Sequence, residues 1–229
     1  MVGNPTLPVN IFLFDLYRSA NIGIFLRTND EYCLAPYGIA DTKSEKIANF
    51  LKAKVVPASI ANSRLLGPLS VMNNNGIVVS RLAEEDEIAG LRRETGLNVA
   101  KLESRFTSVG NLICANDHGA VISEVFSEES AKEIEHILKV PTKRMRLGTF
   151  VQVGAMLAAT NSGAVVHPIA NENEIELLAS VLGVHPEPAT INGGVPFVSS
   201  GFVGNSKGIL VGSLTRGAEQ VILTKAFSR

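Results

Sequence analysis

Short apolar runs and polar turns follow one another at regular intervals along this chain. Four polar turns contain asparagine and end in glycine, and they lie at 73–76, 116–119, 160–163 and 205–208. A fifth segment, 28–31, has a similar sequence but ends in Glu31. The final positions are 31, 76, 119, 163 and 208, so the steps between them are 45, 43, 44 and 45 residues. Such even spacing indicates an internal repeat of about 44 residues.

Each polar turn lies between two short apolar runs. The runs before the turns are Ile24–Leu26, Leu69–Val71, Leu112–Cys114, Met156–Ala158 and Gly201–Val203, and the runs after them are Tyr32–Leu34, Ile77–Val79, Ala120–Ile122, Ala164–Val166 and Ile209–Val211. Because Asn, Asp and Gly tolerate the positive φ of a tight turn, each of these units predicts a β-hairpin. The runs are apolar at successive positions, so we expect the strands to be covered on both faces.

A segment with the apolar period of an amphipathic helix follows each predicted hairpin. The expected helices begin near Asp41, at Glu84, at Ser127, at Asn171 and near Thr215, and the second to fourth end at Gly96, Pro141 and Gly183. Thr42 with Glu45, and Asn171 with Glu174, have the three-residue spacing of a capping box. A further strand then leads into the next unit at 55–56, 99–100 and 145–147, and the segment 11–16 is expected to do so for the first hairpin.

The repeat predicts an α/β ring with five-fold pseudosymmetry. Its units span approximately 9–54, 55–97, 98–141, 142–184 and 185–229. One such unit buries too little apolar surface to fold alone, whereas five units in a closed ring cover their hairpins with their helices. Since no Pro/Ser-rich or charged linker interrupts the series, we expect residues 1–229 to form a single domain, with only 1–8 loosely held.

Composition and charge exclude several classes of protein. The chain is 45% apolar and 19% charged, which is ordinary for a globular domain. Its net charge of −1 argues against a protein held to nucleic acid mainly by phosphate contacts. Cys33 and Cys114 lie within apolar runs and are interpreted as buried free thiols. With no signal-peptide pattern and no apolar stretch near the ~20 residues of a membrane span, we expect a cytoplasmic protein.

Several segments resemble one known family. They are Pro57–Ala61, Ser108–Asn111, Cys114–Asp117, Val166–Pro168 and Asn192–Gly194. Together they resemble the translation initiation factor six family, and the similarity runs from about Asn21 to Phe227. The chain lacks the acidic, Ser-rich tail of the eukaryotic members after its fifth helix, so it is similar to the archaeal form.

The resemblance implies a fold and a function that the repeat alone does not reveal. The fold would be the pentein, a five-fold α/β propeller. The function would be that of a ribosome anti-association factor, which binds the large ribosomal subunit on its intersubunit face and prevents premature association with the small subunit. The partner there would be a ribosomal protein near the sarcin-ricin loop, with possible local rRNA contact, and a role in large-subunit biogenesis is expected. The resemblance further implies a monomer that is no enzyme and needs no cofactor or metal.

The same resemblance identifies candidate ribosome-binding residues. Family positions on the ribosome-facing side correspond to Gly23, Pro68 and Asn111. Counting eight residues back from each turn end gives these three and Ala155 and Ser200, so symmetry would place all five on one rim of the ring. Eukaryotic relatives carry arginine where Pro68 stands, and Arg64 is a candidate to supply the missing charge.

Simpler structural roles exist for each candidate. Gly23, like Gly67, Gly110 and Gly154, would also be required where backbones meet at a crowded axis. Asn111 would also suit a hydrogen-bonding position of the ring itself, and Arg64 a solvated surface. The basic residues Lys139, Lys143, Arg144 and Arg146 are candidates for RNA contact, with a solvated face as the alternative.

Two further functions are open to a ring of this kind. Other penteins modify guanidino compounds with a nucleophilic cysteine near the C-terminus, but no cysteine follows Cys114 here. A binding ring with an unrelated protein partner is the second alternative. The four histidines show no short metal-ligand spacing, so no metal site is predicted.

Overall fold

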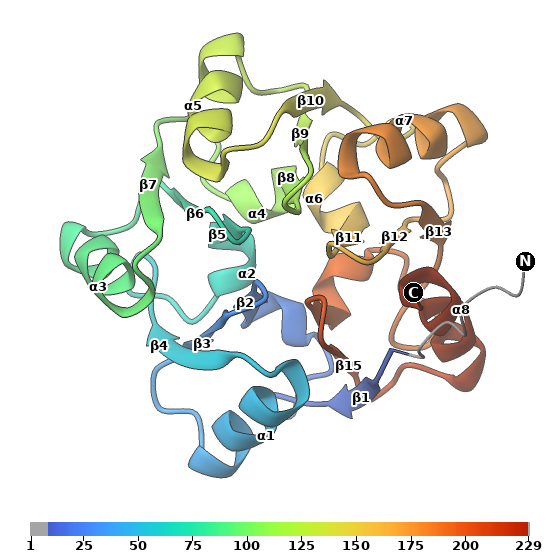
Figure 1. Cartoon of the computed structure of the whole chain (residues 1–229), viewed down its shortest axis with the longest axis horizontal. Coiled ribbons are helices and arrows are strands. Elements are labelled where there is room, and N and C mark those ends of the chain that lie inside the picture. Colours follow the sequence, from blue (N-terminus) through green and yellow to red (C-terminus); the bar gives the residue numbers. More distant parts are fainter. Residues whose placement is uncertain (1–8, 229) are drawn as a thin grey trace, which may run out of the picture.

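Five three-stranded sheets surround a central axis in the computed structural model, which describes residues 9–228 (Figure 1). Each sheet is an antiparallel hairpin whose second strand pairs in parallel with a third strand beyond a helix. The first sheet contains β2 (Arg27–Thr28), β3 (Tyr32–Pro36) and β4 (Lys54–Ala58), and helix α1 (Asp41–Leu51) connects the last two. The expectation for residues 1–8 lies outside the described part of the chain.

The next three sheets repeat this topology. Their elements are β5 (Ser70–Met72), β6 (Gly76–Ser80), α3 (Glu85–Thr95) and β7 (Asn98–Leu102); then β8 (Ile113–Ala115), β9 (Ala120–Ser123), α5 (Glu128–Leu138) and β10 (Thr142–Met145); then β11 (Leu157–Ala159), β12 (Ala164–Val166), α7 (Glu172–Leu182) and β13 (Pro186–Pro188). The predicted hairpins, helices and linking strands are therefore present, although the strand predicted at 145–147 lies at Thr142–Met145, and the five-fold α/β fold of the pentein type is confirmed.

The fifth sheet takes its third strand from the start of the chain. Its hairpin is β14 (Phe202–Gly204) and β15 (Ile209–Gly212), followed by α8 (Gly217–Phe227). Strand β1 (Ile11–Phe14) pairs in parallel with β15, in the register Ile11 to Ile209. The ring of sheets is thus closed by pairing between the two ends of the described chain, and α8 lies beside β1 in Figure 1.

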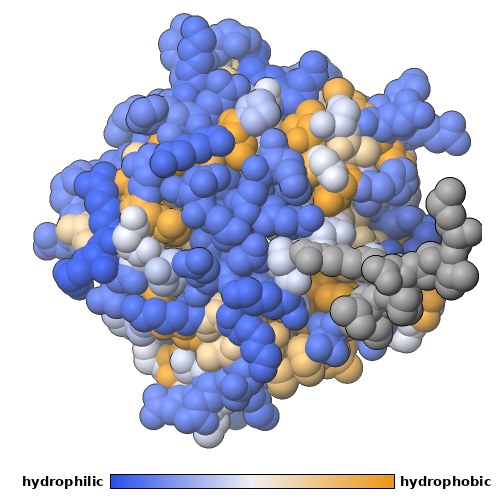
Figure 2. Space-filling view, in the orientation of Figure 1, coloured by the Kyte–Doolittle hydropathy of each residue, from blue (hydrophilic) through white to orange (hydrophobic). Residues whose placement is uncertain are grey.

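The hydrophobic core is divided among the junctions between neighbouring sheets. On β6, for example, Ile77 and Val79 pack with residues of the first sheet, while Val78 packs with residues of the third. Both faces of the strand are therefore buried, as the continuous apolar runs predict. The outer helices add their apolar faces to these clusters, and the face of the ring seen in Figure 2 is largely hydrophilic. Within residues 9–228, no helix combines the length and apolar character that a membrane crossing requires.

The helix boundaries follow the capping signals in most repeats. The Asn171 side chain accepts a hydrogen bond from the Glu174 amide at 3.0 Å, and Glu174 accepts one from the Asn171 amide at 2.9 Å. Ser127 caps α5, and the left-handed residues Gly96 and Gly183 follow the ends of α3 and α7. These boundaries are confirmed.

The capping box predicted for α1 is wrong. The helix begins at Asp41, one residue before Thr42, and its N-cap Ala40 has no capping side chain. The third helical position is then Lys43 rather than an acidic residue. Its Nζ donates to the carbonyl oxygen of Asp15 at 2.8 Å. A lysine therefore holds the loop that a glutamate at the same helix position holds in three other repeats.

A short helical turn precedes each hairpin, where the sequence predicted strand from the first residue of the apolar run. These turns are η1 (Ile22–Ile24), α2 (Leu66–Leu69), α4 (Val109–Leu112), α6 (Val153–Met156) and η2 (Val198–Gly201). The strand prediction is therefore wrong for Leu69, Leu112, Met156 and Gly201, and for all of Ile24–Leu26, because β2 begins only at Arg27. Three or four residues are too few to show a helical period, so a buried turn and a buried strand look alike in sequence.

Polar side chains join the hairpin turns at the other end of the axis. Asn73 Nδ2 donates to the carbonyl oxygen of Asn116 at 3.1 Å and to that of Leu138, at the end of α5, at 2.8 Å. Asn116 and Asn205 make the same pair of contacts in their own repeats. Each asparagine thus ties one turn to the next and to the end of an outer helix.

A second set of five side chains lies at this end, and we call it the turn plug: Asp30, Asn74, Asp117, Asn161 and Ser206. Asn74 Nδ2 donates to Asp30 at 2.8 Å and to Asp117 at 2.5 Å, and Asn161 Nδ2 donates to the same two carboxylates. Burial by itself raises the pKa of Asp30, but hydrogen bonds from Asn74, Ser206 and Asn161 outweigh it and hold this pKa below its usual value.

Candidate functional site

The five short helices form a closed ring of their own at one end of the axis. Each contacts the next, in the order η1, α2, α4, α6, η2 and back to η1. Their backbones touch through glycine: a Cβ on Gly67 would overlap the carbonyl oxygen of Gly23, and one on Gly110 would overlap that of Gly67. The short helices therefore lie as close as backbones allow. We call these helices, together with the loops that lead into them, the helix rim (residues 15–24, 59–69, 103–112, 146–156 and 189–201).

The structure places Gly23 inside this contact and not on the open surface. Gly23 is buried in η1, and a Cβ there would overlap the carbonyl oxygen of Ser199. The crowded-axis explanation is thus confirmed for this glycine. The same contact shows that Gly23 matches Gly67 and Gly110. Counting eight residues back from Glu31 therefore gives a position that is one residue too early in the first repeat.

The turn hydrogen bonds reveal the correct register. The backbone amide of Asn73 donates to the carbonyl oxygen of Gly76. In the first repeat, the backbone amide of Asn29 donates to the carbonyl oxygen of Tyr32 and not to that of Glu31. Tyr32 therefore corresponds to Gly76. The residue equivalent to Pro68 and Asn111 is then Ile24, and Gly23 corresponds to Gly67 and Gly110.

Pro68 and Asn111 occupy matching positions on the adjacent helices α2 and α4, and both are half-buried. The backbone amide of Asn111 donates to the Ser108 carbonyl oxygen at 3.0 Å, and its side chain makes no hydrogen bond within residues 9–228. Asn73 and Asn116, in contrast, use their side-chain amides to hold the ring. The Asn111 amide is therefore available to a partner, which argues against a purely internal role.

The loops that lead into the short helices share a tight turn in four of the five repeats. Single β-bridges join Leu16 to Ser19 and Ile60 to Ser63, and the fourth and fifth repeats have equivalents. The central residues of the first loop, Tyr17 and Arg18, have φ values of 53° and 58°. Large residues rarely adopt this left-handed conformation, and such strain is concentrated at functional positions. Among the described residues, the loop at 103–108 has no such bridge.

Cations and apolar side chains stand side by side on the helix rim. Arg64 is exposed, with its guanidinium carbon 5.2 Å from the ring centre of Tyr17, and Arg105 lies 4.7 Å from the ring centre of Phe106. Exposed fractions are 40% for Tyr17, 44% for Leu65 and 37% for Phe197. None of the rim arginines 18, 64 and 105 forms an ion pair within residues 9–228. Exposed aromatics beside unpaired arginines are typical of protein-binding surfaces.

Carboxylates at the start of the outer helices hold the rim loops in place. Glu219 accepts hydrogen bonds from the Thr190 hydroxyl at 2.7 Å and from the amides of Gly193, Gly194 and Arg216 at 2.7 to 3.0 Å. Burial alone would raise the pKa of Glu219, but these bonds outweigh it and lower the pKa. Glu87 makes the equivalent contacts in the second repeat, and its pKa is lowered for the same reason.

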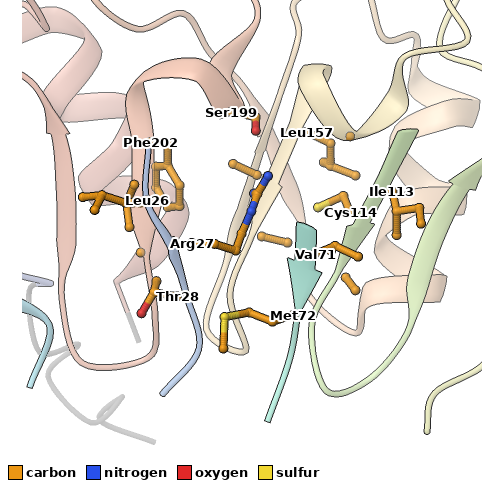
Figure 3. A pocket seen from close by; sticks show the side chains of 16 residues that line it. Leu26, Arg27, Thr28, Val71, Met72, Ile113, Cys114, Leu157, Ser199 and Phe202 are labelled. Carbon is orange, nitrogen blue, oxygen red and sulfur yellow. The ribbon is translucent and has the colours of Figure 1, made fainter. Parts of the chain in front are cut away.

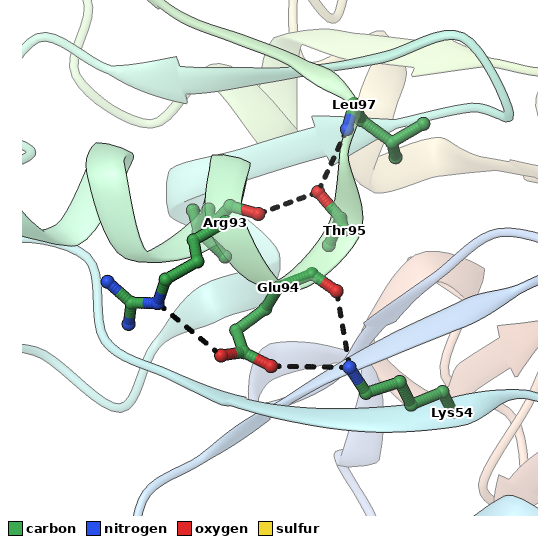
Figure 4. A network of polar contacts seen from close by, with 6 residues as sticks. Lys54, Arg93, Glu94, Thr95 and Leu97 are labelled. Atoms are coloured by element: carbon green, nitrogen blue, oxygen red, sulfur yellow. Dashed lines mark hydrogen bonds and ion pairs between the residues drawn. The ribbon is translucent and has the colours of Figure 1, made fainter.

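Two of the four basic residues that were candidates for RNA contact form ion pairs within the protein, and so does Arg93. Arg144 pairs with Glu128, and Arg146 pairs with Glu124 at 2.7 Å. Arg93 pairs with its neighbour Glu94, which also binds Lys54 of the preceding sheet at 3.2 Å (Figure 4). These pairs favour a solvated charged face over an RNA-binding surface at both places.

The two thiols do not have the setting of a nucleophile. Cys33 and Cys114 are fully or almost fully buried, and burial raises the pKa of each to about 12. A thiol with such a pKa is protonated at neutral pH and unreactive. Within residues 9–228, no cluster of His, Cys, Asp and Glu has the arrangement of a metal site.

Sequence reasoning identified part of the helix rim and missed the rest. Pro68 and Asn111 lie on the neighbouring helices α2 and α4, and Arg64 lies in the loop that leads into α2. Tyr17, Arg18 and Arg105 were missed, although they lie at matching places in the repeat. Aligning the residues that follow each linking strand would have shown a loop with bulky or basic residues in every unit.

The fold and the helix rim define a class of protein: a five-bladed α/β propeller of the pentein type whose rim presents exposed aromatic and basic side chains and whose thiols are buried. Its identity follows from comparison with known proteins. Residues 11–226 match the eIF-6 family. The chain is 44% identical over 219 residues to translation initiation factor 6 of Nitrosopumilus maritimus, covering 96% of this chain and 99% of that protein.

Two further relatives agree. The factor of the same name from Cenarchaeum symbiosum is 43% identical over 220 residues, covering 96% of this chain and all of that protein. The one from Pyrococcus abyssi is 35% identical over 223 residues, covering 95% and 98%. The chain therefore belongs to the eIF-6 family of translation initiation factors. These relatives are named as initiation factors and not as enzymes, so the prediction of a non-enzymatic protein is confirmed.

Proposed function

We propose that this initiation factor binds the large ribosomal subunit on its intersubunit face through the helix rim and thereby prevents premature joining of the small subunit. The primary contact would be a ribosomal protein near the sarcin-ricin loop. The factor would act as a single-domain monomer in the cytoplasm, and binding to new large subunits would give it a role in their biogenesis.

One observation carries most of the proposal: the half-buried side-chain amide of Asn111 makes no hydrogen bond within residues 9–228, on a rim that also presents exposed apolar and cationic groups. An amide with no bond inside the protein can donate two hydrogen bonds and accept two more. On the same rim, Leu65 and Tyr17 supply apolar area, and Arg64 supplies charge. This mixture suits a protein contact better than a phosphate backbone, in agreement with the net charge of −1.

Arg64 is the residue that we propose to compensate for Pro68. Pro68 lies in α2, and Arg64 lies four residues earlier in the loop that enters the same helix. Its stacking against Tyr17 holds the guanidinium at the rim without an ion pair that would have to be broken on binding. Gly23 would contribute indirectly, because it lets η1 approach η2 and so shapes the surface that the partner meets.

Co-sedimentation with purified ribosomal subunits tests this proposal. We expect the protein to pellet with large subunits and to stay in the supernatant with small ones. Asn111→Arg should abolish the association, because a longer charged side chain would stand where the partner must fit, and should leave Tm nearly unchanged since the position is half-buried and unbonded.

Asn49→Arg is the matched control, because Asn49 is exposed near the end of α1, where the Leu51 carbonyl oxygen binds Asn205 at the opposite end of the axis from the helix rim. It should pellet as the natural protein does. Large subunits that leave the natural protein in the supernatant at physiological salt would contradict the proposal.

A further inference from the structure

A cavity of about 50 Å³ lies on the axis of the ring, between the helix rim and the turn plug (Figure 3). Its wall is mostly apolar and includes Leu26, Met72, Cys114 and Phe202. A water needs about 10 to 15 Å³ measured in this way. The cavity therefore has room for a few waters, or for one small anion with water.

The side chain of Arg27 projects into this cavity. In Figure 3 its guanidinium group points toward the short-helix end, away from Thr28 and Met72. One Nη2 hydrogen donates to the carbonyl oxygen of Gly67. Arg27 Nε is buried and has no partner, and no further hydrogen bond joins the guanidinium to the described residues. A guanidinium carries five N–H donors, so most of its donors need acceptors that the protein does not provide.

The charge of Arg27 also lacks a counter-charge in the cavity. Among the described residues that line it, none is acidic. Burial lowers the pKa of Arg27 to about 10, so the side chain stays protonated at neutral pH. Cys114 is close enough to interact electrostatically, but its own pKa of about 12 keeps it neutral. Asp30 and Asp117 belong to the turn plug, where Asn74 and Asn161 already engage their carboxylates.

A second donor without a partner faces the same space. Ser199 lies in η2 and lines the cavity, and its hydroxyl makes no hydrogen bond within residues 9–228. Figure 3 shows the hydroxyl at the end of the cavity toward which the Arg27 guanidinium points. A permanent cation and a free hydroxyl thus converge in an otherwise apolar space, and both can donate to one acceptor.

We propose that the central cavity binds a small monovalent inorganic anion, with chloride as the physiological species, between the Arg27 guanidinium and the Ser199 hydroxyl. The anion balances the buried charge of Arg27 and accepts hydrogen bonds from the N–H and O–H groups that have no partner within the protein. Because Arg27 also holds the Gly67 carbonyl, occupancy stabilises the contact between η1 and α2. Ser199 and Gly67 belong to the helix rim, so the anion would lie beneath the surface proposed to contact the large subunit.

Crystals of the full chain grown in sodium bromide test the site directly. Bromide replaces chloride and scatters anomalously, so we expect an anomalous peak within hydrogen-bond distance of the Arg27 guanidinium. Electron density at that place without anomalous signal means water and overturns the proposal. This experiment uses the natural sequence and does not depend on whether a variant folds.

Thermal unfolding in chloride or gluconate at constant ionic strength tests the same site in solution. Gluconate is too large for the cavity. We expect Tm of the natural protein to rise by about 3 to 5 °C at a chloride concentration about ten times Kd. Arg27→Met should remove this dependence, and Ser199→Ala should shift it to higher chloride concentration.

Arg81→Met provides the control, because Arg81 is exposed and remote from the axis. It should retain the full chloride dependence. If the natural protein and Arg27→Met respond equally to chloride, or neither responds, the cavity holds no specific anion.

Discussion

Glycines of the short helices determine how closely the repeats approach one another at the axis. Gly67 and Gly110 each lie against the backbone of the preceding short helix, in a position where any side chain would overlap a carbonyl oxygen. The polypeptide there has an ordinary backbone conformation, so space alone requires glycine. The helix rim is consequently built on backbone contacts that side-chain motion cannot relax.

Gly110→Ala should therefore destabilise the protein severely. The methyl group would meet the Gly67 carbonyl oxygen and the Arg27 guanidinium, and overpacking of this kind costs about 3 kcal/mol or more. Gly90→Ala is the matched control within α3, where no atom lies closer than 4.0 Å to the added carbon. It should stabilise by about 0.5 to 1 kcal/mol. Chemical denaturation measures both, and equal stability of Gly110→Ala and the natural protein would refute the packing argument.

Individual residues were predicted from sequence to different extents. The asparagines of the turns were recognised because their chemistry is local, and a tight turn needs them whatever surrounds it. The left-handed backbone of Tyr17 and Arg18 gave no such signal, since neither residue favours that conformation. The one-residue error at Glu31 had the same origin: without a glycine, nothing in the first turn shows where it ends.

The loops of the helix rim depend on carboxylates supplied by the outer helices. Glu219 joins four donors from the loop and from the start of α8. The pKa of Glu219 in the folded protein lies below its value in the unfolded chain, which is about 4.3. The contribution of Glu219 to stability is therefore complete above about pH 4.3. The contribution is lost as the pH falls through the folded pKa, where the carboxylate is protonated in both states.

Glu219→Gln should consequently destabilise the protein by about 1 to 3 kcal/mol at pH 7, and the difference from the natural protein should shrink below about pH 4. Glu176→Gln, at an exposed position on α7, serves as the control and should change little at any pH. Free energies of unfolding between pH 3 and 7 provide the measurement. If the loss in free energy of unfolding caused by Glu219→Gln does not vary with pH, the charge of Glu219 does not stabilise the loop.

The main elements were predictable because each repeat contains its own local signals. Turn residues and apolar runs recur in every unit, and helix caps recur in most, so an error in one repeat is corrected by the others. The short helices were missed for the opposite reason. They are only three or four residues long, and they are helical because a ring of neighbours encloses them, which a linear sequence does not show.

At the scale of the whole molecule, the ring has two different ends. The hairpin turns meet at the turn plug, where every polar side chain is engaged with another. The short helices meet at the helix rim, where Asn111, Arg64 and Tyr17 keep groups free for a partner. Symmetry alone would make the five repeats of the rim equivalent, so specificity must come from these differences between repeats.

The central claim is that a bound factor keeps the two ribosomal subunits apart, and a subunit-joining assay tests it most directly. Purified subunits would be mixed at a magnesium concentration that allows association, with increasing amounts of the protein, and joined ribosomes quantified on sucrose gradients. The account predicts that the joined fraction falls as large subunits become saturated, that Asn49→Arg acts like the natural protein, and that Asn111→Arg has no effect. An unchanged joined fraction with large subunits fully occupied would contradict it.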